Sequence, residues 1–279
     1  MSEAPAQTDF SEARPSNPPE VVVVSLKPRD LPKRSVEWKD VHLPVDILLV
    51  TVKDDEFYSC LYYLNRGFYK SYKPELGLLY LGEMGDGKKK LKVAVIQCNM
   101  GSTTVVPKAV PALCPRAVIY VGFCAGLKEK KVKFGDVIIS SKLATYTYTK
   151  GSGEPKILER GFQVPASPLL NGILKFADHG WEAPLKNPED LEVKVHKDSL
   201  LLSGSGVVSS DERRKKLIKK YPQAIGVEME DEGKISVNND ENCEVHAEFL
   251  QSTVMSLVLH SFAPREHYYS AGQNSLLQV

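Results

Sequence analysis

Continuous apolar runs alternate with polar, helix-like stretches through the middle of the chain. The runs are rich in β-branched residues and predict strands buried on both faces; they span residues 45–52, 91–98, 117–121 and 137–140. Acids at Asp54, Asp55 and Glu56 stand where the first turn of a helix favours negative charge, and they predict a helix that continues to about Arg66. This alternation of strands and helices predicts one three-layer α/β domain.

The second half of the chain predicts fewer regular elements. Residues 146–168 predict a loop-rich insertion, and residues 169–179 predict a helix. Strands are predicted at 200–208 and 224–227, on either side of a strongly basic helix at 212–221. One basic helix without interleaved aromatic residues is a weak nucleic-acid signal, so we interpret it as a solvated face.

Composition divides the chain into three parts. Residues 1–40 are rich in Pro, Ser and charge and predict a mobile N-terminal tail, and the folded domain is predicted at 41–233. Residues 234–242 are polar and turn-prone, so residues 234–279 are predicted to form a separate C-terminal segment. Within that segment the apolar run 254–262 is interrupted by Ser and His, and therefore predicts core rather than membrane.

Charge and cysteine usage exclude several classes of function. The 279 residues carry a formal net charge of +1, which gives no case for binding nucleic acid or an acidic membrane. No signal peptide opens the chain, and no apolar run reaches transmembrane length. Five cysteines without a Cys-x-x-Cys pair predict reduced thiols in a cytoplasmic protein. The six histidines are scattered without ligand spacing, so no metal site is expected.

A bend of small residues follows the strand at 117–121. Its sequence is Gly122-Phe123-Cys124-Ala125-Gly126, and small residues let a backbone approach a ligand closely. A glycine-containing loop at the carboxyl end of a strand is also where open α/β sheets bind ligands. Two core strands joined by a tight turn would show the same pattern, so the bend alone leaves both interpretations open.

A second candidate lies where the strand at 224–227 runs directly into acidic residues. The sequence there is Glu228-Met229-Glu230-Asp231-Glu232. Such acids either begin a solvated helix or form a pocket edge where a carboxylate binds paired hydroxyls. The residues themselves leave both interpretations open.

Four blocks of this chain resemble the nucleoside phosphorylase and methylthioadenosine/S-adenosylhomocysteine nucleosidase family. They occur in the family's order over residues 45–233 and read VDILLVTVKDDEF, VIQCNMGS, AVIYVGFCAGLKEKKVKFGDVIIS and SGSGVVSSDERRKKLIKKYPQAIGVEMEDEG. The resemblance implies a three-layer α/β/α fold around a mixed, twisted sheet. It also implies cleavage of the N-glycosidic bond between a purine-type base and ribose.

The resemblance also assigns roles to residues. Glu230 would accept hydrogen bonds from the ribose hydroxyls, with Glu228 beside it and Met229 packed against the sugar. Glu56 matches the carboxylate that activates water in the nucleosidases, although an acid at that position can equally be a helix-start residue. The remaining binding residues would be Ser102 near the ribose or the nucleophile, Gly122 and Phe123 in the bend, Cys124 and Ala125 facing the base, and Ser210 and Asp211 at the edge of the base.

Two departures from the family change the expected chemistry. Phosphorylases of this family hold phosphate with an arginine before the bend and a hydroxyl residue after it, where this chain has Tyr120 and Phe123. A phenol and an apolar ring cannot replace a guanidinium at a phosphate dianion, which favours hydrolysis over phosphorolysis. The family's Ser-Asp pair, whose aspartate protonates the leaving base, has no match after Gly233, so by this resemblance 234–279 is a divergent C-terminal segment.

Two hypotheses therefore stand. The first is an enzyme that cleaves a purine-type nucleoside, by water or by transfer of the glycosyl group to phosphate, with activity weakened by the missing acid. The second is an inactive nucleoside-binding or interaction module. No cofactor is expected apart from phosphate as a possible co-substrate. The resemblance further implies a nucleoside as the small-molecule partner and a homo-oligomer.

Overall fold

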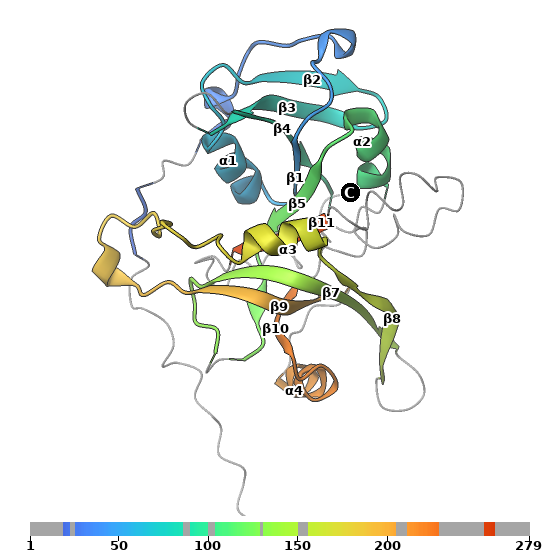
Figure 1. The fold of residues 1–279 in the computed structure, drawn as a ribbon, viewed down its shortest axis with the longest axis vertical. Helices are drawn as coiled ribbons and strands as arrows, with labels where there is room; N and C mark the ends of the chain where they lie inside the picture. Colours follow the sequence, from blue (N-terminus) through green and yellow to red (C-terminus); the bar gives the residue numbers. More distant parts are fainter. Residues whose placement is uncertain are drawn as a thin grey trace, which may run out of the picture.

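One twisted, mixed β-sheet runs through the molecule (Figure 1). It is seen in a computed structural model that describes residues 19–22, 26–85, 90–99, 104–128, 131–149, 156–204, 211–228 and 254–259. At its centre, β1 (Ile47–Thr51) pairs in parallel with β4 (Leu91–Gln97) on one side and β5 (Ala117–Gly122) on the other. These strands form where the continuous apolar runs predicted them.

The other strands extend the sheet in both directions. Beyond β4 lie β3 (Gly77–Met84) and β2 (Tyr69–Lys73), both antiparallel to their neighbours. Beyond β5 the order is β11 (Val254–Leu259), β7 (Val137–Thr149), β9 (Val195–Gly204), β10 (Ala224–Glu228) and β6 (Ala125–Gly126), with β8 (Lys156–Pro165) paired to β7. Parallel and antiparallel pairs both occur, so the predicted mixed sheet is confirmed.

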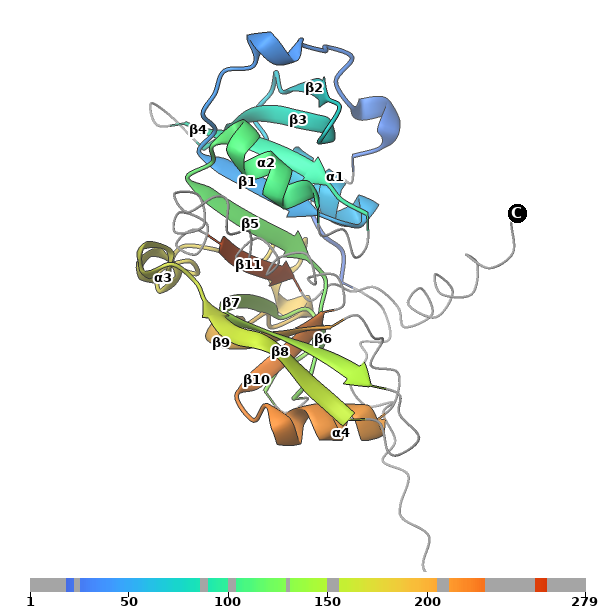
Figure 2. The ribbon, with the colours of Figure 1, turned by 90° about the vertical axis from the view of Figure 1, so that its right-hand side faces the viewer.

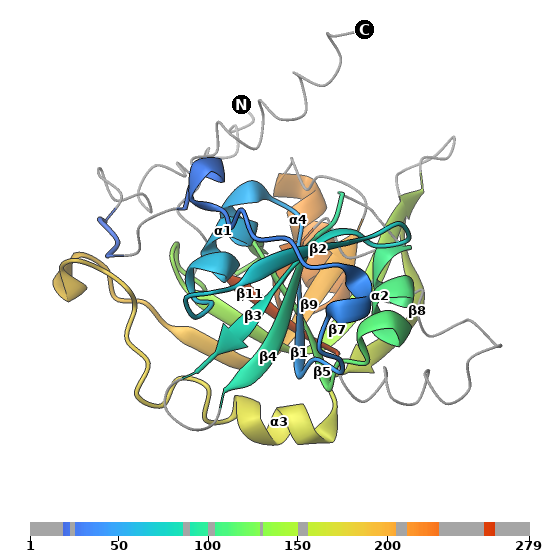
Figure 3. The ribbon, with the colours of Figure 1, turned by 90° about the horizontal axis from the view of Figure 1, so that it is seen from above.

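Helices cover both faces of the central strands. Figure 3 shows α1 (Asp54–Tyr62) and α2 (Val105–Leu113) on opposite sides of them. The side chains that α1 buries are Phe57, Cys60 and Leu61, and those that α2 buries are Val106, Ala109, Val110 and Leu113. Because successive strand residues point to opposite faces, Leu49 packs toward α1 while Leu48 and Val50 pack toward α2. The predicted three-layer fold is therefore confirmed.

Two further helices cover the second half of the sheet (Figure 1). α3 (Pro168–Leu174) packs Leu174 against Val137 and Ile139 of β7, and α4 (Asp211–Lys220) buries Leu217 against β7 and β9. Short 3₁₀ turns lie at Pro28–Asp30, Trp38–Asp40 and Pro188–Asp190.

The second half of the sheet curls back on itself. β5 ends at Gly122, and Phe123 and Cys124 carry the chain to β6, which pairs with β10 at the far end of the strand order (Figure 2). The strands β5, β11, β7, β9, β10 and β6 therefore form a closed, barrel-like part of the sheet. The two residues Phe123 and Cys124 connect β5 to β6. This closure brings the end of β10 next to the end of β5.

The loop-rich insertion predicted at 146–168 is wrong. β7 continues to Thr149 and forms an antiparallel hairpin with β8, which spans Lys156–Pro165. Alternating Thr and Tyr residues along 145–149 favour an extended strand, because β-branched and aromatic side chains fit a pleated surface. That alternation is typical of a strand rather than a loop.

The predicted helix at 169–179 is shorter in the structure. α3 ends at Leu174, and the following amides bond to the third residue back: Phe176 N donates to Ile173 O at 3.0 Å and His179 N to Phe176 O at 3.0 Å. This bonding continues the chain as successive turns rather than as an α-helix. Strand β2 was not predicted, because its sequence Tyr-Lys-Ser-Tyr-Lys alternates without a continuous apolar run.

Parts of both end segments contact the domain. Leu26 and Leu31 pack against the cluster beneath α1, and Val21 forms an isolated bridge with Leu185. In the C-terminal segment, β11 lies between β5 and β7. The division of the chain at residues 40 and 233 stays a prediction. Among the described residues, no helix is long and apolar enough to span a membrane.

Candidate active site

The carboxylate of Glu56 is fixed by the backbone at the start of α1. The chain leaves β1 at Thr51, and the amides of Val52 and Lys53 donate to Glu56 Oε2 at 2.9 and 2.8 Å. These amides cannot be satisfied within the helix, so a carboxylate three or four residues later provides their acceptor. Glu56 therefore acts as a helix-start acid, one of the two roles its sequence position allows.

The same carboxylate also reaches the glycine bend. Phe123 N, 67 residues away in the sequence, donates to Glu56 Oε1 at 3.0 Å. A side chain at Gly122 would place its Cβ only 3.2 Å from Glu56 Oε1, so the absence of a side chain leaves room for this contact. Glu56 thus joins the ends of β1 and β5 at one corner.

Burial and hydrogen bonding act on Glu56 in opposite directions. Burial raises its pKa above the ordinary value of 4.5, because a carboxylate loses hydration there. The amides of Lys53, Val52 and Phe123 and the positive charge of Lys53 oppose that shift without cancelling it. A carboxylate with a raised pKa is a stronger general base, while three amide donors keep its orientation fixed.

The bend is held against β10. Ala125 and Gly126 pair with Val227 and Gly226, and Leu127 N donates to Ile225 O at 2.8 Å. This pairing leaves Ala125 exposed and places the buried Cys124 side chain in a core cluster.

Glycine makes the close contact between the bend and β10 possible. A Cβ at Gly226 would lie 2.9 Å from Ile138 Cδ1, 2.9 Å from Leu201 Cδ1 and 3.3 Å from Cys124 Sγ. The Cys124 thiol therefore packs against the β10 backbone. Contact between Cys124 and a base stays a prediction.

Glu228 lies at the same corner, at the carboxyl end of β10. Its side chain is buried, and its negative charge raises the pKa of Tyr120 on β5 and of Tyr146 on β7. The acidic residue and the bend after Tyr120 are therefore neighbours in space. Their roles in binding stay predictions.

A buried phenol and two buried thiols near this corner are neutral. Burial, Cys98 and Glu228 raise the pKa of Tyr120, so its phenol is protonated at neutral pH. Burial raises the pKa of Cys98 to about 11, and burial with the charge of Glu56 raises that of Cys60 to about 12. Neither thiol is a thiolate, so neither is a candidate nucleophile.

Comparison with known families decides the assignment. Residues 59–230, which are well over half of the chain, match the phosphorylase superfamily. The chain belongs to the phosphorylase superfamily. The match includes β4, β5, the bend and β10, the elements that position the Gly122 and Glu228 corner.

Solved structures of nucleosidases share this superfamily fold. A 5′-methylthioadenosine/S-adenosylhomocysteine nucleosidase from Neisseria meningitidis, in complex with methylthio-immucillin-A, superposes with a TM-score of 0.56 at 17% identity; the match covers 76% of this chain and 84% of that one. A futalosine hydrolase mutant of Helicobacter pylori gives 0.55 at 18% identity, covering 83% of this chain and 96% of that one. At this identity the likeness shows the fold.

One curated relative is similar in sequence. It is a death domain-containing ATP nucleosidase from Amphimedon queenslandica, 27% identical over 161 residues. The match covers 53% of this chain and 30% of the relative. The chain therefore spans less than a third of the length of that relative.

The other predicted site residues fall into two groups. Ser102, Ser210, Met229 and Glu230 lie outside the described residues. Asp211 begins α4, where its Oδ2 lies 2.7 Å from Lys215 Nζ in an exposed i,i+4 ion pair. Its predicted contact with the base is untested.

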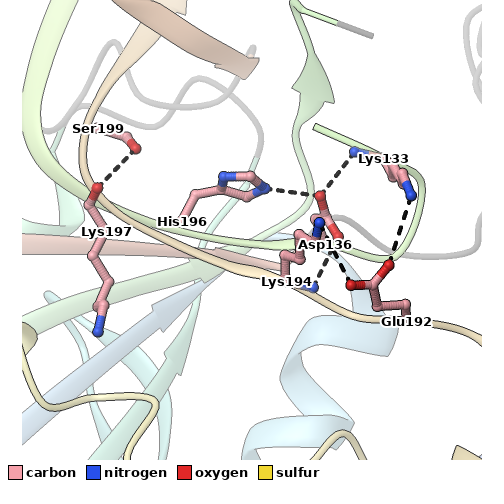
Figure 4. A network of polar contacts seen from close by, with 7 residues as sticks. All are labelled: Lys133, Asp136, Glu192, Lys194, His196, Lys197 and Ser199. Carbon is pink, nitrogen blue, oxygen red and sulfur yellow. Dashed lines mark hydrogen bonds and ion pairs between the residues drawn. The ribbon is translucent and has the colours of Figure 1, made fainter. Parts of the chain in front are cut away.

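A buried aspartate anchors the start of β7 and β9 (Figure 4). Asp136 accepts hydrogen bonds from Lys133 N at 2.8 Å and Lys194 N at 2.9 Å, and its Oδ2 lies 2.8 Å from His196 Nε2. Glu192 pairs with the two lysine ammonium groups on the outside of the network. Two backbone donors and one imidazole satisfy the carboxylate, so this network ties two strand ends together. No cluster of metal-ligating side chains occurs within the described ranges.

Proposed function

We propose that this protein cleaves the N-glycosidic bond of a purine-type nucleoside by hydrolysis. The observation that carries the proposal is the position of Glu56, whose buried carboxylate is fixed by Val52, Lys53 and the bend residue Phe123. Glu228, at the end of β10, supplies a second carboxylate at the same corner. Membership of the phosphorylase superfamily and the nucleosidase folds support the same reaction.

In the proposed reaction, Glu56 takes a proton from a water molecule placed below the anomeric carbon. The water oxygen bonds to that carbon while the carbon–nitrogen bond breaks, and the bonding electrons leave with the base, which takes up a proton from solvent water. Cleavage passes through a ribosyl cation-like transition state, which a nearby carboxylate stabilises. Glu228, with Glu230 by resemblance, would hold the ribose hydroxyls.

The surroundings of the bend support water rather than phosphate as the nucleophile. Tyr120 is buried and neutral, and the side chain of Phe123 is apolar. A phosphate dianion needs cationic or multiple N–H donors, and the Phe123 amide already donates to Glu56. Hydrolysis needs no cofactor, and we propose none.

Three further proposals concern the substrate, the location of the protein and its partners. The name of the curated relative suggests that nucleotides such as ATP belong among the candidate substrates. Protonated, buried thiols at Cys60 and Cys98 suit a reducing compartment, and we propose that the protein is cytoplasmic. We also propose a homo-oligomer that binds neither nucleic acid nor membranes.

The test is release of free base from adenosine, inosine, methylthioadenosine and ATP, followed by chromatography with and without phosphate. We expect base and free ribose (or its 5′-substituted form) at a rate that phosphate does not change. In ¹⁸O-labelled water the sugar should carry one ¹⁸O atom. Ribose 1-phosphate as product would overturn hydrolysis. Calorimetric binding without any base release would instead support the nucleoside-binding module.

A further inference from the structure

Two consecutive peptide groups direct their N–H bonds at the carboxylate of Glu56. Val52 N and Lys53 N both donate to Glu56 Oε2, at 2.9 and 2.8 Å. Both peptide bonds are trans, so the C=O of each peptide points away from its own N–H. A group that binds either carbonyl therefore also sets the direction of the N–H bond on the opposite side of the peptide.

The last residue of β4 and the residue after it bind these two carbonyls. The first carbonyl belongs to Thr51, the last residue of β1, and it accepts from Cys98 N at 2.8 Å as a continuation of the β1–β4 pairing. The second belongs to Val52, which lies beyond the end of β1, and it accepts from Gln97 Nε2 at 3.2 Å. The first contact needs only a backbone amide, whereas the second needs the carboxamide of one particular side chain.

A further contact fixes the orientation of that carboxamide. Gln97 Nε2 also donates to Asp54 Oδ1 at 2.8 Å, and Asp54 is the first residue of α1. The carbonyl of Val52 and the carboxylate of Asp54 offer only acceptors, so the nitrogen of the carboxamide faces them, with one acceptor for each of its two N–H bonds. Gln97 therefore spans the turn that connects β1 to α1.

We propose that Gln97 is a positioning residue for Glu56: its carboxamide holds the Val52–Lys53 peptide so that the Lys53 N–H points at the carboxylate. The proposal rests on the proposed function, because it assigns the side chain that fixes the general base of that reaction. A hydrogen bond accepted by a peptide carbonyl also polarises the peptide and strengthens its N–H as a donor. Without Gln97 this peptide is free to rotate, and the Lys53 N–H turns away from Glu56.

The titration of Glu56 reports on this contact directly. Burial has the largest effect and raises the pKa of Glu56, and the amide of Lys53 leads the effects that lower it. The positive charge of Lys53 also lowers this pKa, and the neighbouring thiol of Cys60 is protonated. Gln97→Met leaves Lys53, Asp54 and Cys60 in place and changes no charge, so a shift in the pKa of Glu56 measures the hydrogen bond.

Asn65 provides a matched control just beyond the C-terminal end of α1. Its Nδ2 donates to Gly85 O at 3.1 Å, so it is also a carboxamide that binds a backbone carbonyl. Gln97→Met and Asn65→Leu each replace a carboxamide with an apolar side chain of similar shape. Only the first removes a donor from the peptide that binds Glu56.

The first arm of the experiment is an NMR titration of protein labelled with ¹³C at the glutamate carboxyl groups. The Glu56 signal is assigned by its absence from the Glu56→Gln protein. In Gln97→Met its midpoint should lie about half a pH unit above that of wild type, because a weaker donor stabilises the ionised form less. The Lys53 amide should also exchange with solvent about tenfold faster. Asn65→Leu should match wild type in both measurements.

The second arm measures base release from adenosine, methylthioadenosine and ATP. Gln97→Met should lower kcat about fivefold while KM stays within about twofold, because the base is less well placed but the sugar contacts are intact. In a Glu56→Gln background the same change should alter kcat by less than about twofold, since the carboxylate that Gln97 positions is absent. Thermal unfolding confirms that each variant is folded.

The two arms separate failure of this proposal from failure of the proposed function. If wild type cleaves a substrate while Gln97→Met keeps the wild-type kcat and the wild-type titration of Glu56, the role of Gln97 is wrong and the proposed function stands. An equal loss of kcat with and without the Glu56 carboxylate would also overturn that role, because Gln97 would then act through another group. If wild type cleaves no substrate, the proposed function fails, and the titration of Glu56 alone decides whether Gln97 positions it.

Discussion

Two buried carboxylates at the candidate site have different surroundings. Glu56 is fixed by three backbone amides, from Val52, Lys53 and Phe123. Glu228 is buried among side chains from distant parts of the chain, and its charge raises the pKa of Tyr120 on β5 and of Tyr146 on β7. Backbone amide donors do not depend on which side chains surround them. The side chains around Glu228, in contrast, can each be removed by a single substitution.

This difference suggests how the two halves of the site divide the work. A carboxylate that must accept a proton at one point benefits from rigid donors and a dry environment, as at Glu56. A carboxylate that binds sugar hydroxyls needs a correct direction and charge, which side chains around Glu228 can adjust. Variants should therefore affect turnover most at Glu56 and the pH dependence of binding most at Glu228.

The largest effect is expected from Glu56→Gln. Removing the general base should lower kcat by about 10²–10⁴-fold, while nucleoside affinity changes little because Glu228 is intact. The matched control is Asp55→Asn, an exposed acid in the same helix turn, which should retain wild-type kcat. Base release measured at saturating substrate checks both. A Glu56→Gln protein with wild-type turnover would remove Glu56 from the mechanism.

The pH dependence of kcat/KM is a second test of Glu56 as the general base. Because burial raises the pKa of Glu56 above 4.5, the base is protonated at low pH, and kcat/KM should fall about tenfold per pH unit below that raised pKa. The free energy of unfolding depends on pH in the opposite direction. Because the pKa of Glu56 is raised in the folded protein, the stabilisation linked to its protonation is fully present below pH 4.5 and is lost as pH rises through the raised pKa. Rates from pH 4 to pH 8 should show an acidic limb centred above pH 4.5. The residual rate of Glu56→Gln should lack that limb.

A smaller effect is expected from Gly122→Ala. The added methyl would lie 3.2 Å from Glu56 Oε1, so the carboxylate must shift by a few tenths of an ångström, and kcat should fall about tenfold. Gly172→Ala in α3 is the control, because a Cβ there meets nothing within 4 Å. Equal kcat for both alanine variants would show that the space at Gly122 is not needed.

The smallest effect concerns a third, exposed carboxylate. Asp211→Asn removes the ion pair with Lys215, which should change the free energy of unfolding by less than about 0.5 kcal/mol because surface pairs are screened. Chemical denaturation measures this change. A loss above 2 kcal/mol would mean that Asp211 has a structural role beyond this pair.

The sequence predicted the strands and the helix of the site better than the contacts between them. The acids before Phe57 predicted the start of α1, and the apolar runs predicted β1, β4 and β5. The bond from Phe123 to Glu56 spans 67 residues and depends on how the sheet curls, which local patterns do not encode. Tyr146 lies in a strand where a loop was predicted, although the alternation of Thr and Tyr favours a strand. Its close approach to Gly204 depends on the pairing of β7 with β9, which a local pattern does not specify.

The C-terminal segment illustrates a second limit. An apolar run at 254–262 predicted core, and β11 lies there between β5 and β7. The apolar run does not specify which strands lie beside it, because a short central strand has the same apolar pattern at any central position of a sheet. Family resemblance also failed there, since the expected Ser-Asp pair is not present after Gly233.

The most direct test of the account is a crystal structure of the Glu56→Gln protein soaked with a nucleoside that the wild-type protein cleaves. The account predicts a sugar held between residue 56 and Glu228, with a water molecule on the residue 56 side of the anomeric carbon. A nucleoside bound away from the bend at Gly122 and Phe123 would contradict it, whatever activity the protein shows.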